Sequence, residues 1–432
     1  MAVPLRPCQL PACGRCGHSP PKTPVNAPLR PAFLCPFVLQ YRRQTPGSIF
    51  LIIHLPFSIF PSSMPESLRP TYLEVNLSQL RKNLEAIRAW VTPARVMPIL
   101  KANAYGHGLD GVAKYIADFS DYLGVATLEE GIHLRQIGVD KPILVMGGTL
   151  PEQIPWFLRY DLTLTASSAD LLRAADQYAS PSGQKIRAHL KVDTGMERVG
   201  VRDSEAVPFL ELAASCKSVE VEGIYSHFAN ADSLDLAHAK LQLERFQEVL
   251  RFYERRSLPP PPLRHISNSG GILQLPEANF DLVRPGIMFY GVYPALDLPR
   301  TVDVKPAITW RSRVAYSKVT PPGRPVSYGS TWQAERPTRI VTVPCGYADG
   351  YFRRMSGRAR VLIHGKSYPQ VGRICMDQFM VDGGDDAIAL GDDVVLLGDG
   401  ITAYDFAEWM GTSPYEVLTS ISARVPRVFV NE

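Results

Sequence analysis

The sequence predicts an α/β protein in which a (β/α)8 TIM-like barrel precedes a mostly antiparallel β domain. Two observations support the barrel: eight short apolar runs lie between residues 96 and 290, and segments with helical spacing of apolar residues alternate with them. A third observation supports the β domain: after Asp303 apolar and polar residues alternate, interrupted by Gly, Pro and Asp. An open doubly wound sheet is the alternative for the first part, but such sheets usually have fewer strands.

Composition sets broad limits on the class of protein. With 432 residues, the chain is long enough for two domains, and its net charge of +4, with both signs scattered, indicates no nucleic-acid partner. Cys8, Cys13 and Cys16, with His18 nearby, have loosely metal-like spacing, but no second pair follows. The cysteines of the later chain form no disulfide pattern, which favours a reducing, cytoplasmic compartment.

Residues 1–64 are expected to be disordered or absent from the working protein, because they are Pro-rich without helical or strand periodicity. Met64 is then a candidate start. The apolar run of residues 49–60 is interrupted by His54 and Pro56 and is too short to span a bilayer. A secretion signal that begins downstream of Met1 is the alternative. We therefore expect the barrel in residues 65–302 and the β domain in residues 303–432.

Each barrel element follows from local pattern. Ser78 is the expected cap of a helix over Gln79–Trp90. The expected strands are Val96–Leu100, Tyr122–Ala126, Ile143–Met146, Leu162–Thr165, Ile186–Val192, Val221–Ser226, Leu263–Ile266 and Leu282–Tyr290. The expected helices between them are Gly111–Asp118, Leu128–Gln136, Pro151–Tyr160, Ala169–Gln177, Glu205–Ser215 and Leu236–Arg255. Right-handed crossovers between parallel strands close such a set into a barrel.

The β domain is expected to contain strands over Ala307–Val319, Arg339–Pro344, Ala359–Ile363, Val371–Val381 and Asp393–Leu397, with a helix near Thr402–Met410. Its loops are rich in polar and aromatic residues, including Tyr328, Trp332 and the segments 345–350 and 375–377. Loops on a rigid scaffold often carry function, although structural turns would explain any one of them.

Chemically active residues gather where barrel strands end, which is where barrel enzymes place their active sites. Lys101 ends the first strand, within the segment Leu100–Gly108. Burial there would disfavour its ammonium form and make it a nucleophile for a Schiff base, whereas a solvated lysine at the rim is the plain alternative. Lys191 and Asp193 lie at the end of the fifth strand, His227 follows the sixth, and Arg284 lies in the eighth. The residues that follow the seventh strand are Ser267, Asn268 and Ser269.

The last two strands end in segments suited to a phosphate. The segment His265–Gly271 supplies hydroxyls and small residues before a short helix, and Pro285-Gly286-Ile287 allows close approach of the backbone. Loops after strands seven and eight form the usual phosphate site of barrels. A capped turn without a ligand is the alternative for the Ser-Asn-Ser-Gly-Gly run.

Taken together, seven motifs resemble those of the alanine racemase family, bacterial fold-type III enzymes that depend on pyridoxal 5′-phosphate. The resemblance runs from about residue 69 to residue 429 and includes the segments 101–108, 191–200, 225–229, 283–286, 326–329, 346–350 and 372–377. It implies a (β/α)8 barrel, a β domain and a homodimer with shared active sites. It also implies an isomerase that interconverts L-alanine and D-alanine and supplies D-alanine for peptidoglycan.

The resemblance implies two catalytic bases. Lys101 binds pyridoxal phosphate and serves as the base for the D enantiomer, and Tyr328 of the partner subunit serves for the L enantiomer. His227 is implied to support Tyr328, because a tyrosine with a pKa near 10 is a poor base at neutral pH. Arg284, braced by His265, is implied to face the pyridine nitrogen and, having no acceptor, to leave that nitrogen unprotonated.

The remaining implied residues bind cofactor and substrate. The phosphate would be held by Tyr105, Ser269, Gly286, Ile287 and Tyr415, and the substrate carboxylate by Arg198 and the Met376 backbone N–H. Lys191 aligns with a lysine that is often carbamylated and orients the arginine. Tyr347 and Asp377 would narrow the pocket. No metal ligand and no membrane span is implied.

Three rival functions remain at this point. A broad-specificity racemase differs only in pocket width, which sequence does not reveal. A decarboxylase of basic amino acids would be favoured by an acidic residue at position 284, and Arg284 stands there. A non-catalytic pyridoxal carrier would resemble the barrel alone, whereas Tyr328 and the whole β domain are present here.

Overall fold

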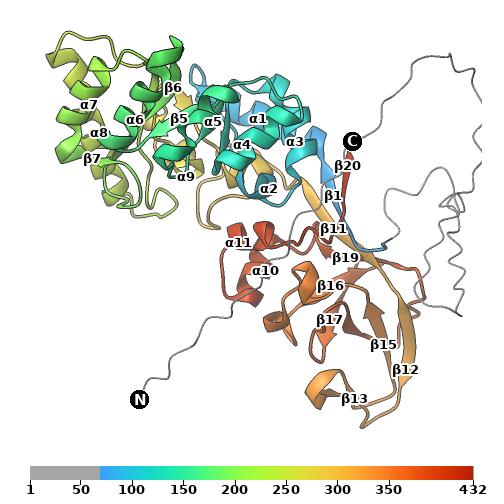
Figure 1. Ribbon diagram of the computed structural model, residues 1–432. Coiled ribbons are helices and arrows are strands. Elements are labelled where there is room, and N and C mark those ends of the chain that lie inside the picture. The colour runs from blue at the N-terminus through green and yellow to red at the C-terminus, as the bar shows by residue number, and fades with distance from the viewer. Residues whose placement is uncertain (1–68, 432) are drawn as a thin grey trace, which may run out of the picture. The chain divides into compact units, whose positions relative to one another are not determined.

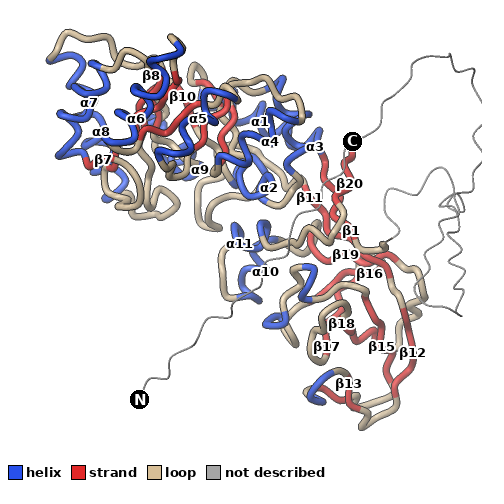
Figure 2. Tube along the Cα trace, viewed as in Figure 1, coloured by secondary structure: helices blue, strands red, loops and turns tan. Residues whose placement is uncertain are grey.

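The computed structural model describes residues 69–431, and the predictions for residues 1–64, including Cys8, Cys13, Cys16 and Met64, lie outside this part of the chain (Figure 1). Its described residues form one parallel sheet system wrapped by helices and one large, mostly antiparallel sheet (Figure 2). This arrangement confirms the predicted fold class.

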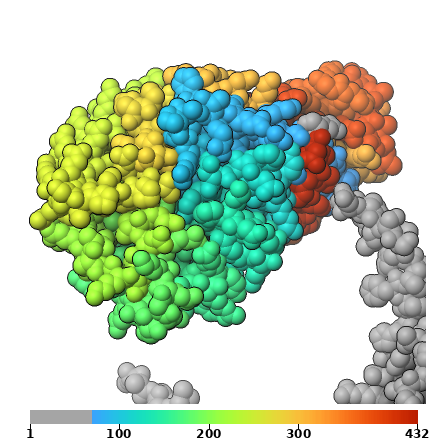
Figure 3. Space-filling model, turned by 90° about the horizontal axis from the view of Figure 1, so that it is seen from above, coloured from blue at the N-terminus to red at the C-terminus, as the bar shows by residue number. Residues whose placement is uncertain are grey.

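The parallel strands curve into a closed ring. Six of them pair in the order β3-β4-β5-β6-β8-β9, with β7 beside β6, and β10 pairs with β2. Backbone hydrogen bonds join the two sets: Leu100 N–H donates to Gly124 O, and Arg284 N–H donates to Ser267 O. The first and last parts of the barrel sequence therefore meet, as the contact between the blue and yellow segments in Figure 3 also shows.

The barrel strands are β2 (Arg95–Val96), β3 (Leu123–Val125), β4 (Ile143–Val145), β5 (Thr163–Ala166), β6 (Ile186–Asp193), β7 (Val201–Arg202), β8 (Val219–Tyr225), β9 (Leu263–His265) and β10 (Leu282–Val283). The helices of this part are α1 (Leu77–Val91), α2 (Lys101–Tyr105), α3 (Leu109–Ile116), α4 (Leu128–Gln136), α5 (Ile154–Arg159), α6 (Ala169–Ala179), α7 (Ala206–Ser215), α8 (Ala237–Arg255) and α9 (Ser269–Gln274). The longer helices cover the outside of the strands (Figure 1).

Several details of the barrel differ from the sequence prediction. The first predicted strand, Val96–Leu100, is observed as Arg95–Val96 with Ile99 in an isolated bridge. The cap of α1 is Asn76 and not Ser78, because the Asn76 side chain accepts the Gln79 N–H and the helix begins at Leu77. The strand predicted over Leu282–Tyr290 ends at Val283, and Ile287–Tyr290 form a 3-10 turn. The intervening Arg-Pro-Gly explains the early end, since proline has no N–H to donate to a neighbouring strand.

The nine-stranded sheet has the order β12-β15-β18-β17-β16-β19-β11-β1-β20. Its strands are β1 (Tyr72–Asn76), β11 (Ile308–Arg313), β12 (Tyr316–Thr320), β15 (Thr338–Val343), β16 (Arg360–Ile363), β17 (Lys366–Val371), β18 (Phe379–Gly384), β19 (Asp393–Leu397) and β20 (Arg427–Val430). A small hairpin, β13 (Pro325–Val326) with β14 (Trp332–Gln333), and the helices α10 (Ala403–Met410) and α11 (Pro414–Thr419) complete this part.

The two ends of the described chain meet in this sheet. Strand β1 pairs antiparallel with β11 and parallel with β20, so a strand that precedes the barrel in sequence belongs to the C-terminal sheet. The predicted boundary between residues 302 and 303 remains a proposal, and β1, which precedes that boundary in sequence, pairs with strands that follow it. Strand β20 also contacts the segment after Lys101: Arg427 donates to Gly106 O, and a Cβ on Gly108 would lie 3.0 Å from the Phe429 ring.

Among residues 69–431, no helix is long and apolar enough to cross a membrane.

Candidate active site

A cavity of about 410 Å³ lies at the C-terminal ends of the barrel strands. Its wall combines residues from the barrel with residues of α11 and the segment just before it. The lining residues are Ile99, Lys101, Ala102, Tyr105, Met146, His227, Asn268, Ser269, Arg284, Gly286, Ser413, Tyr415, Glu416 and Thr419. One cavity thus contains the candidate lysine, arginine and histidine together with five hydroxyl-bearing residues from sites far apart in sequence.

Lys101 reaches this cavity from an uncommon turn of backbone. The four residues that follow it, Ala102 to Tyr105, all have φ between 50° and 56° and form a left-handed turn. Such a turn is costly for side chains with a Cβ, so other contacts must hold it. Glu130 does so, accepting the Ala102 N–H at 2.7 Å. Burial, followed by the charge of Arg198, lowers the pKa of Lys101, which favours the neutral amine needed of a nucleophile.

The hydroxyl-bearing residues Tyr105, Ser269 and Tyr415 line the same cavity together with Gly286 and form a cradle there. Ser269 Oγ accepts the Gly286 N–H at 3.0 Å and the Met288 N–H at 3.4 Å, so its own proton is free to be donated elsewhere. The phenol of Tyr105 passes so close to Gly286 that a Cβ there would lie 2.7 Å from its oxygen. The Tyr415 ring lies 6.2 Å from the Tyr105 ring. Neutral hydroxyl donors around a glycine fit a phosphate group.

Arg284 is buried at the base of the cavity and is held on three sides. Nη1 donates to His265 Nδ1 at 2.6 Å, and Nη2 donates to the backbone oxygens of Ser226 at 2.7 Å and Ile266 at 3.0 Å. Burial lowers the pKa of Arg284 to about 10, so its guanidinium remains charged at neutral pH. No described residue accepts a hydrogen bond from its Nε–H, which leaves this donor for a ring nitrogen in the cavity.

The protonation of His227 follows from its neighbour. Arg284 Nη2 lies 3.1 Å from His227 Nδ1, and because arginine has no acceptor, Nδ1 must carry the lone pair. Burial and the positive charge of Arg284 hold the pKa of His227 well below its ordinary value, so the ring is neutral. The proton is therefore on Nε2, and His227 lines the cavity with a hydrogen-bond donor.

Neither Lys191 nor Arg198 lines this cavity. The Lys191 ammonium is buried, donates to Val192 O at 2.8 Å and lies 5.2 Å from the centre of the Tyr225 ring. Burial, with the charge of Arg284, lowers the pKa of Lys191 to about 7. Asp193 accepts backbone N–H groups from the loop up to Arg198, which fixes the loop that carries the arginine.

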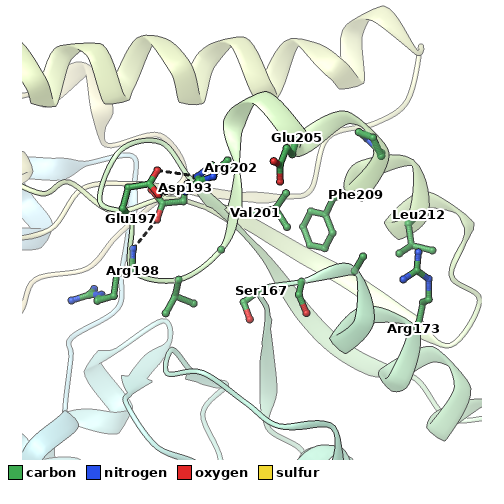
Figure 4. Close-up of a pocket in the computed structure, with 15 residues that line it drawn as sticks. Ser167, Arg173, Asp193, Glu197, Arg198, Val201, Arg202, Glu205, Phe209 and Leu212 are labelled. Carbon is green, nitrogen blue, oxygen red and sulfur yellow. Dashed lines mark hydrogen bonds and ion pairs between the residues drawn. The ribbon is translucent and has the colours of Figure 1, made fainter.

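Arg198 itself is exposed at the edge of a second cavity of about 680 Å³. Figure 4 shows its guanidinium turned away from Phe209 and Leu212, which lie at the other end of that cavity. The loop is fastened at its far side by an ion pair of 2.7 Å between Arg202 and Glu197.

The second predicted base does not line the cavity of Lys101. Tyr328 lies in the turn between β13 and β14 and is 70% exposed. With it lie Tyr347, 38% exposed, and Met376, 52% exposed, around a separate hollow of the β domain. Asp377 is exposed and pairs with Arg424 at 2.8 Å. A single chain therefore holds these predicted residues in two groups.

The other predicted residues belong to the cavity or its support. Tyr105, Ser269, Gly286 and Tyr415 line the cavity, whereas Ile287 is buried just behind the Gly286 backbone. His265 does not line it and acts on it through Arg284.

Sequence reasoning did not single out two residues that support the site, Glu130 and Tyr225. Glu130 was recognisable only as the third residue of a capping box that begins at Thr127. Tyr225 stacks on His265 with ring centroids 4.7 Å apart, and it carries the charges of Lys191 and Arg284 over its ring. Within residues 69–431, no group of three or more His, Cys, Asp or Glu side chains is placed to hold a metal ion.

Comparison with known proteins gives a consistent result. The family profile described as "Alanine racemase, N-terminal domain" matches residues 75–294, and that described as "Alanine racemase, C-terminal domain" matches residues 307–429. The chain is 45% identical over 373 residues to an alanine racemase of Carboxydothermus hydrogenoformans, an alignment that covers 84% of this chain and 100% of that protein.

Solved structures agree with the sequence relatives. An alanine racemase of Clostridium difficile 630 superposes with a TM-score of 0.80 at 35% identity, covering 85% of this chain and 97% of that chain. An alanine racemase from Bacillus anthracis with bound L-Ala-P superposes with a TM-score of 0.78 at 34% identity, covering 85% of this chain and 96% of that chain.

Proposed function

The chain belongs to the alanine racemase family, and from this premise we propose which of its residues interconvert L-alanine and D-alanine. The enzymes of this family depend on pyridoxal phosphate. When bound, pyridoxal phosphate withdraws electrons from the α-carbon of the amino acid and makes its α-proton removable. The observation that carries the proposal is that one cavity is lined by Lys101, whose pKa is lowered by burial, by the Arg284 guanidinium and by the hydroxyls of Tyr105 and Ser269.

Lys101 would bind the cofactor aldehyde, and the hydroxyl cradle would bind its phosphate. Ser269 Oγ already accepts two backbone N–H groups, and its proton would be donated to a phosphate oxygen. Tyr105 and Tyr415 would add phenolic donors, and the absence of a side chain at Gly286 gives the phosphate room beside the Tyr105 oxygen. Ile287 would contribute its backbone N–H, whereas the Gly286 N–H is already donated to Ser269 Oγ, so Gly286 would serve by leaving room for the phosphate.

Arg284 would face the pyridine nitrogen and set the type of reaction. Its guanidinium bears only donors and remains charged, so the nitrogen beside it accepts a hydrogen bond and stays unprotonated. A carboxylate at this position would protonate the nitrogen and favour deeper electron withdrawal, as decarboxylation requires. The positive charge of Arg284 therefore argues for simple proton transfer at the α-carbon and against a decarboxylase of basic amino acids.

Racemisation needs a base on each side of the α-carbon, and we assign these to Lys101 and Tyr328. Lys101 would exchange the proton of the D enantiomer and Tyr328 that of the L enantiomer. In one chain Tyr328 is exposed and does not line the cavity of Lys101. Its exposure supports a homodimer in which each chain supplies Tyr328, Tyr347, Met376 and Asp377 to the cavity of its partner.

His227 would prepare Tyr328 for its role as a base. The neutral ring presents Nε2–H to the cavity because Arg284 occupies Nδ1. A phenolate oxygen accepts such a bond more strongly than a phenol oxygen does, so the contact would lower the pKa of Tyr328. Arg284 thereby supports both the cofactor and, through His227, the second base.

Arg198 would bind the substrate carboxylate, with the backbone N–H of Met376 from the partner as a second donor. A guanidinium matches a carboxylate in shape and charge. Lys191 would orient Arg198 once its amine carries a carbamate, because a plain ammonium would repel the arginine. Tyr347 and Asp377 would narrow the pocket around the methyl group of alanine, although a wider amino-acid range remains the alternative.

We further propose that the enzyme works in the cytoplasm and supplies D-alanine for peptidoglycan. The cysteines of the described chain, Cys216, Cys345 and Cys375, are all free, which supports a reducing compartment.

The test is incubation of the holoenzyme with L-alanine in heavy water. Loss of optical rotation together with deuterium at the α-carbon is expected, and both should vanish in Lys101→Ala. Exchange without racemisation would leave Lys101 its role and remove Tyr328 from the proposal. Racemisation of serine or lysine at a rate equal to that of alanine would favour the broad-specificity alternative.

A further inference from the structure

The hydrogen-bonded support of Arg284 continues into the interior of the barrel. His265 accepts from Arg284 Nη1 with Nδ1 at 2.6 Å, and its Nε2 lies 2.8 Å from His189 Nδ1. Both imidazoles are fully buried. The interior of a (β/α)8 barrel is usually filled with branched apolar side chains, so two linked histidines at this depth need a reason beyond packing.

The direction of each hydrogen bond follows from the arginine. Arginine has no acceptor, so His265 Nδ1 holds a lone pair and its proton lies on Nε2. His265 therefore donates to His189 Nδ1, which must also hold a lone pair. Burial, with the charge of Arg284, lowers the pKa of His189 to about 3 and holds that of His265 well below its ordinary value, so both rings are neutral. The proton of His189 is thus on Nε2.

The chain ends at a carboxylate. His189 Nε2 makes no hydrogen bond to a described residue and lies 3.9 Å from Glu222 Oε2. Glu222 is held there by the Tyr122 hydroxyl, which donates to the same oxygen at 3.0 Å. Its side chain is 22% exposed, and Arg187 lies 3.9 Å from its other oxygen. The order is therefore guanidinium, imidazole, imidazole, carboxylate: the hydrogen bonds run from Arg284 to His189, and the carboxylate lies 3.9 Å beyond His189 Nε2.

Arg284 lacks a closer negative partner. Among residues 69–431 it forms no ion pair, and its acceptors are backbone oxygens and imidazole nitrogens. A negative charge 3.9 Å from the last imidazole attracts its N–H and polarises the two hydrogen bonds before it, which makes His265 Nδ1 a stronger acceptor. The guanidinium is then held more firmly in its charged form and in one orientation.

We propose that His189 and Glu222 are positioning residues for the racemisation, acting on Arg284 through His265 from within the barrel. The inference rests on the proposed role of Arg284 at the cofactor. Neither residue lines the active-site cavity, so neither touches substrate or cofactor. Their loss should therefore lower kcat through Arg284 and leave the KM for alanine nearly unchanged.

The kinetic test is a double-mutant cycle in the holoenzyme. Glu222→Gln is expected to lower kcat about fivefold when Arg284 is present and less than about twofold when Arg284 is already replaced by Lys. Glu220→Gln is the matched control, since Glu220 lies exposed on the same strand and its side chain makes no hydrogen bond to a described residue. Equal losses in the two backgrounds, or no loss in either, would overturn the inference.

Variants of His189 distinguish an effect transmitted through this chain from general damage to the fold. His189→Asn keeps an acceptor at the place of Nδ1 and leaves nothing at the place of Nε2, so it should match the loss of Glu222→Gln. The double variant His189→Asn/Glu222→Gln should lose no more than either single one. His189→Leu removes both contacts of the imidazole and should lower kcat further than either single variant. Additive losses in the double variant would contradict a shared route.

A spectroscopic readout is independent of turnover. In histidine-labelled holoenzyme, the ring ¹⁵N resonances of His265 and His189 should report neutral rings protonated on Nε2, and Glu222→Gln should shift the His189 Nε2–H proton upfield. A proton on Nδ1 of either ring would refute the directed chain. If Arg284→Lys alone leaves kcat unchanged, the assignment of Arg284 to the cofactor fails; a normal loss there with no effect of Glu222→Gln refutes only the present inference.

Discussion

Glu130 accepts a 2.7 Å hydrogen bond from the backbone N–H of Ala102, the residue directly after Lys101. Its other oxygen accepts from the backbone N–H groups of Ala126 at 2.8 Å and Thr127 at 3.2 Å. One carboxylate thus fastens the left-handed turn of the lysine to the end of β3 and the start of α4. The position of the proposed catalytic amine depends on a residue of another strand–helix unit.

Replacement of Glu130 by Gln should loosen this turn. Its carboxylate makes three charge-assisted hydrogen bonds, and an amide, which has only one carbonyl oxygen, cannot accept all three, so we expect a loss of about 1–3 kcal/mol in stability. The loss of its negative charge should also lower the pKa of Lys101 further. Urea unfolding and the pH dependence of cofactor binding measure the two effects. Glu129→Gln, an exposed neighbour in the same helical turn, is the control, and equal behaviour of the two variants would contradict the role given to Glu130.

The hydroxyl cradle predicts which changes weaken cofactor binding. Ser269→Ala removes a donor for the phosphate and the acceptor of two backbone N–H groups, so the Kd for pyridoxal phosphate should rise about tenfold. Gly286→Ala should raise it as well, because the new Cβ would lie 2.7 Å from the Tyr105 oxygen. When Tyr105 is already replaced by Phe, Gly286→Ala should raise the Kd for pyridoxal phosphate by a smaller factor. Unchanged Kd values by absorbance titration would place the phosphate elsewhere.

Buried histidines predict acid sensitivity. Burial lowers the pKa of His107 to about 4 and that of His189 to about 3, and it holds those of His227 and His265 well below 6.5. The unfolded chain binds these protons below pH 6.5 and the folded chain does not, so stability is complete above that pH and falls as the pH decreases. Each histidine contributes about 1.4 kcal/mol per pH unit in that range.

Urea unfolding of the holoenzyme at pH 7.5, 6.5 and 5.5 checks this slope. His107→Gln should reduce it, because one proton-binding group is removed. A urea midpoint that does not move between pH 7.5 and 5.5 would show that these rings are protonated in the folded state.

Lys191 is predicted to carry a carbamate. Burial lowers its pKa to about 7, and the neutral amine that reacts with carbon dioxide therefore becomes dominant above that pH. In ¹³C-bicarbonate the holoenzyme should show a carbamate signal that grows between pH 6 and pH 8 and is absent from Lys191→Ala. Full activity of a protein without that signal would contradict the hypothesis. Lys185→Ala is the control, because Lys185 is exposed and lies directly before strand β6; this variant should keep the carbamate signal.

The sequence predicted the order of the elements because their cause is local. The helix Leu128–Gln136 was placed correctly to the residue, since Thr127 caps it and its apolar residues have helical spacing. The eighth strand was predicted too long, because Leu282–Tyr290 is a continuous apolar run except for Arg284-Pro285-Gly286, and periodicity alone does not distinguish a strand from a buried 3-10 turn. Strand β17 could not be predicted because it begins with the polar residues Lys366 and Ser367. Its pairing with β16 makes it a strand, and that pairing leaves no apolar pattern there.

Several predicted residues line one cavity, but the hydrogen bonds that connect them could not be predicted. Lys101, His227 and Arg284 could be named from strand ends and from the family motifs. The link from Arg284 through His265 and His189 could not be, because it joins strands that are distant in sequence and depends on depth within the barrel. The pairing of β1 with β20 is hidden for the same reason, since partners at opposite ends of a chain leave no local pattern.

The central claim is that each active site takes Lys101 from one chain and Tyr328 from the other. The most direct measurement combines Lys101→Ala and Tyr328→Phe chains, each carrying a different purification tag, and isolates the mixed dimer. Each parent dimer should be inactive, and the mixed dimer should recover about half of the wild-type alanine racemisation, because one of its two sites is intact. A mixed dimer of verified composition that binds pyridoxal phosphate but racemises no alanine would contradict the claim.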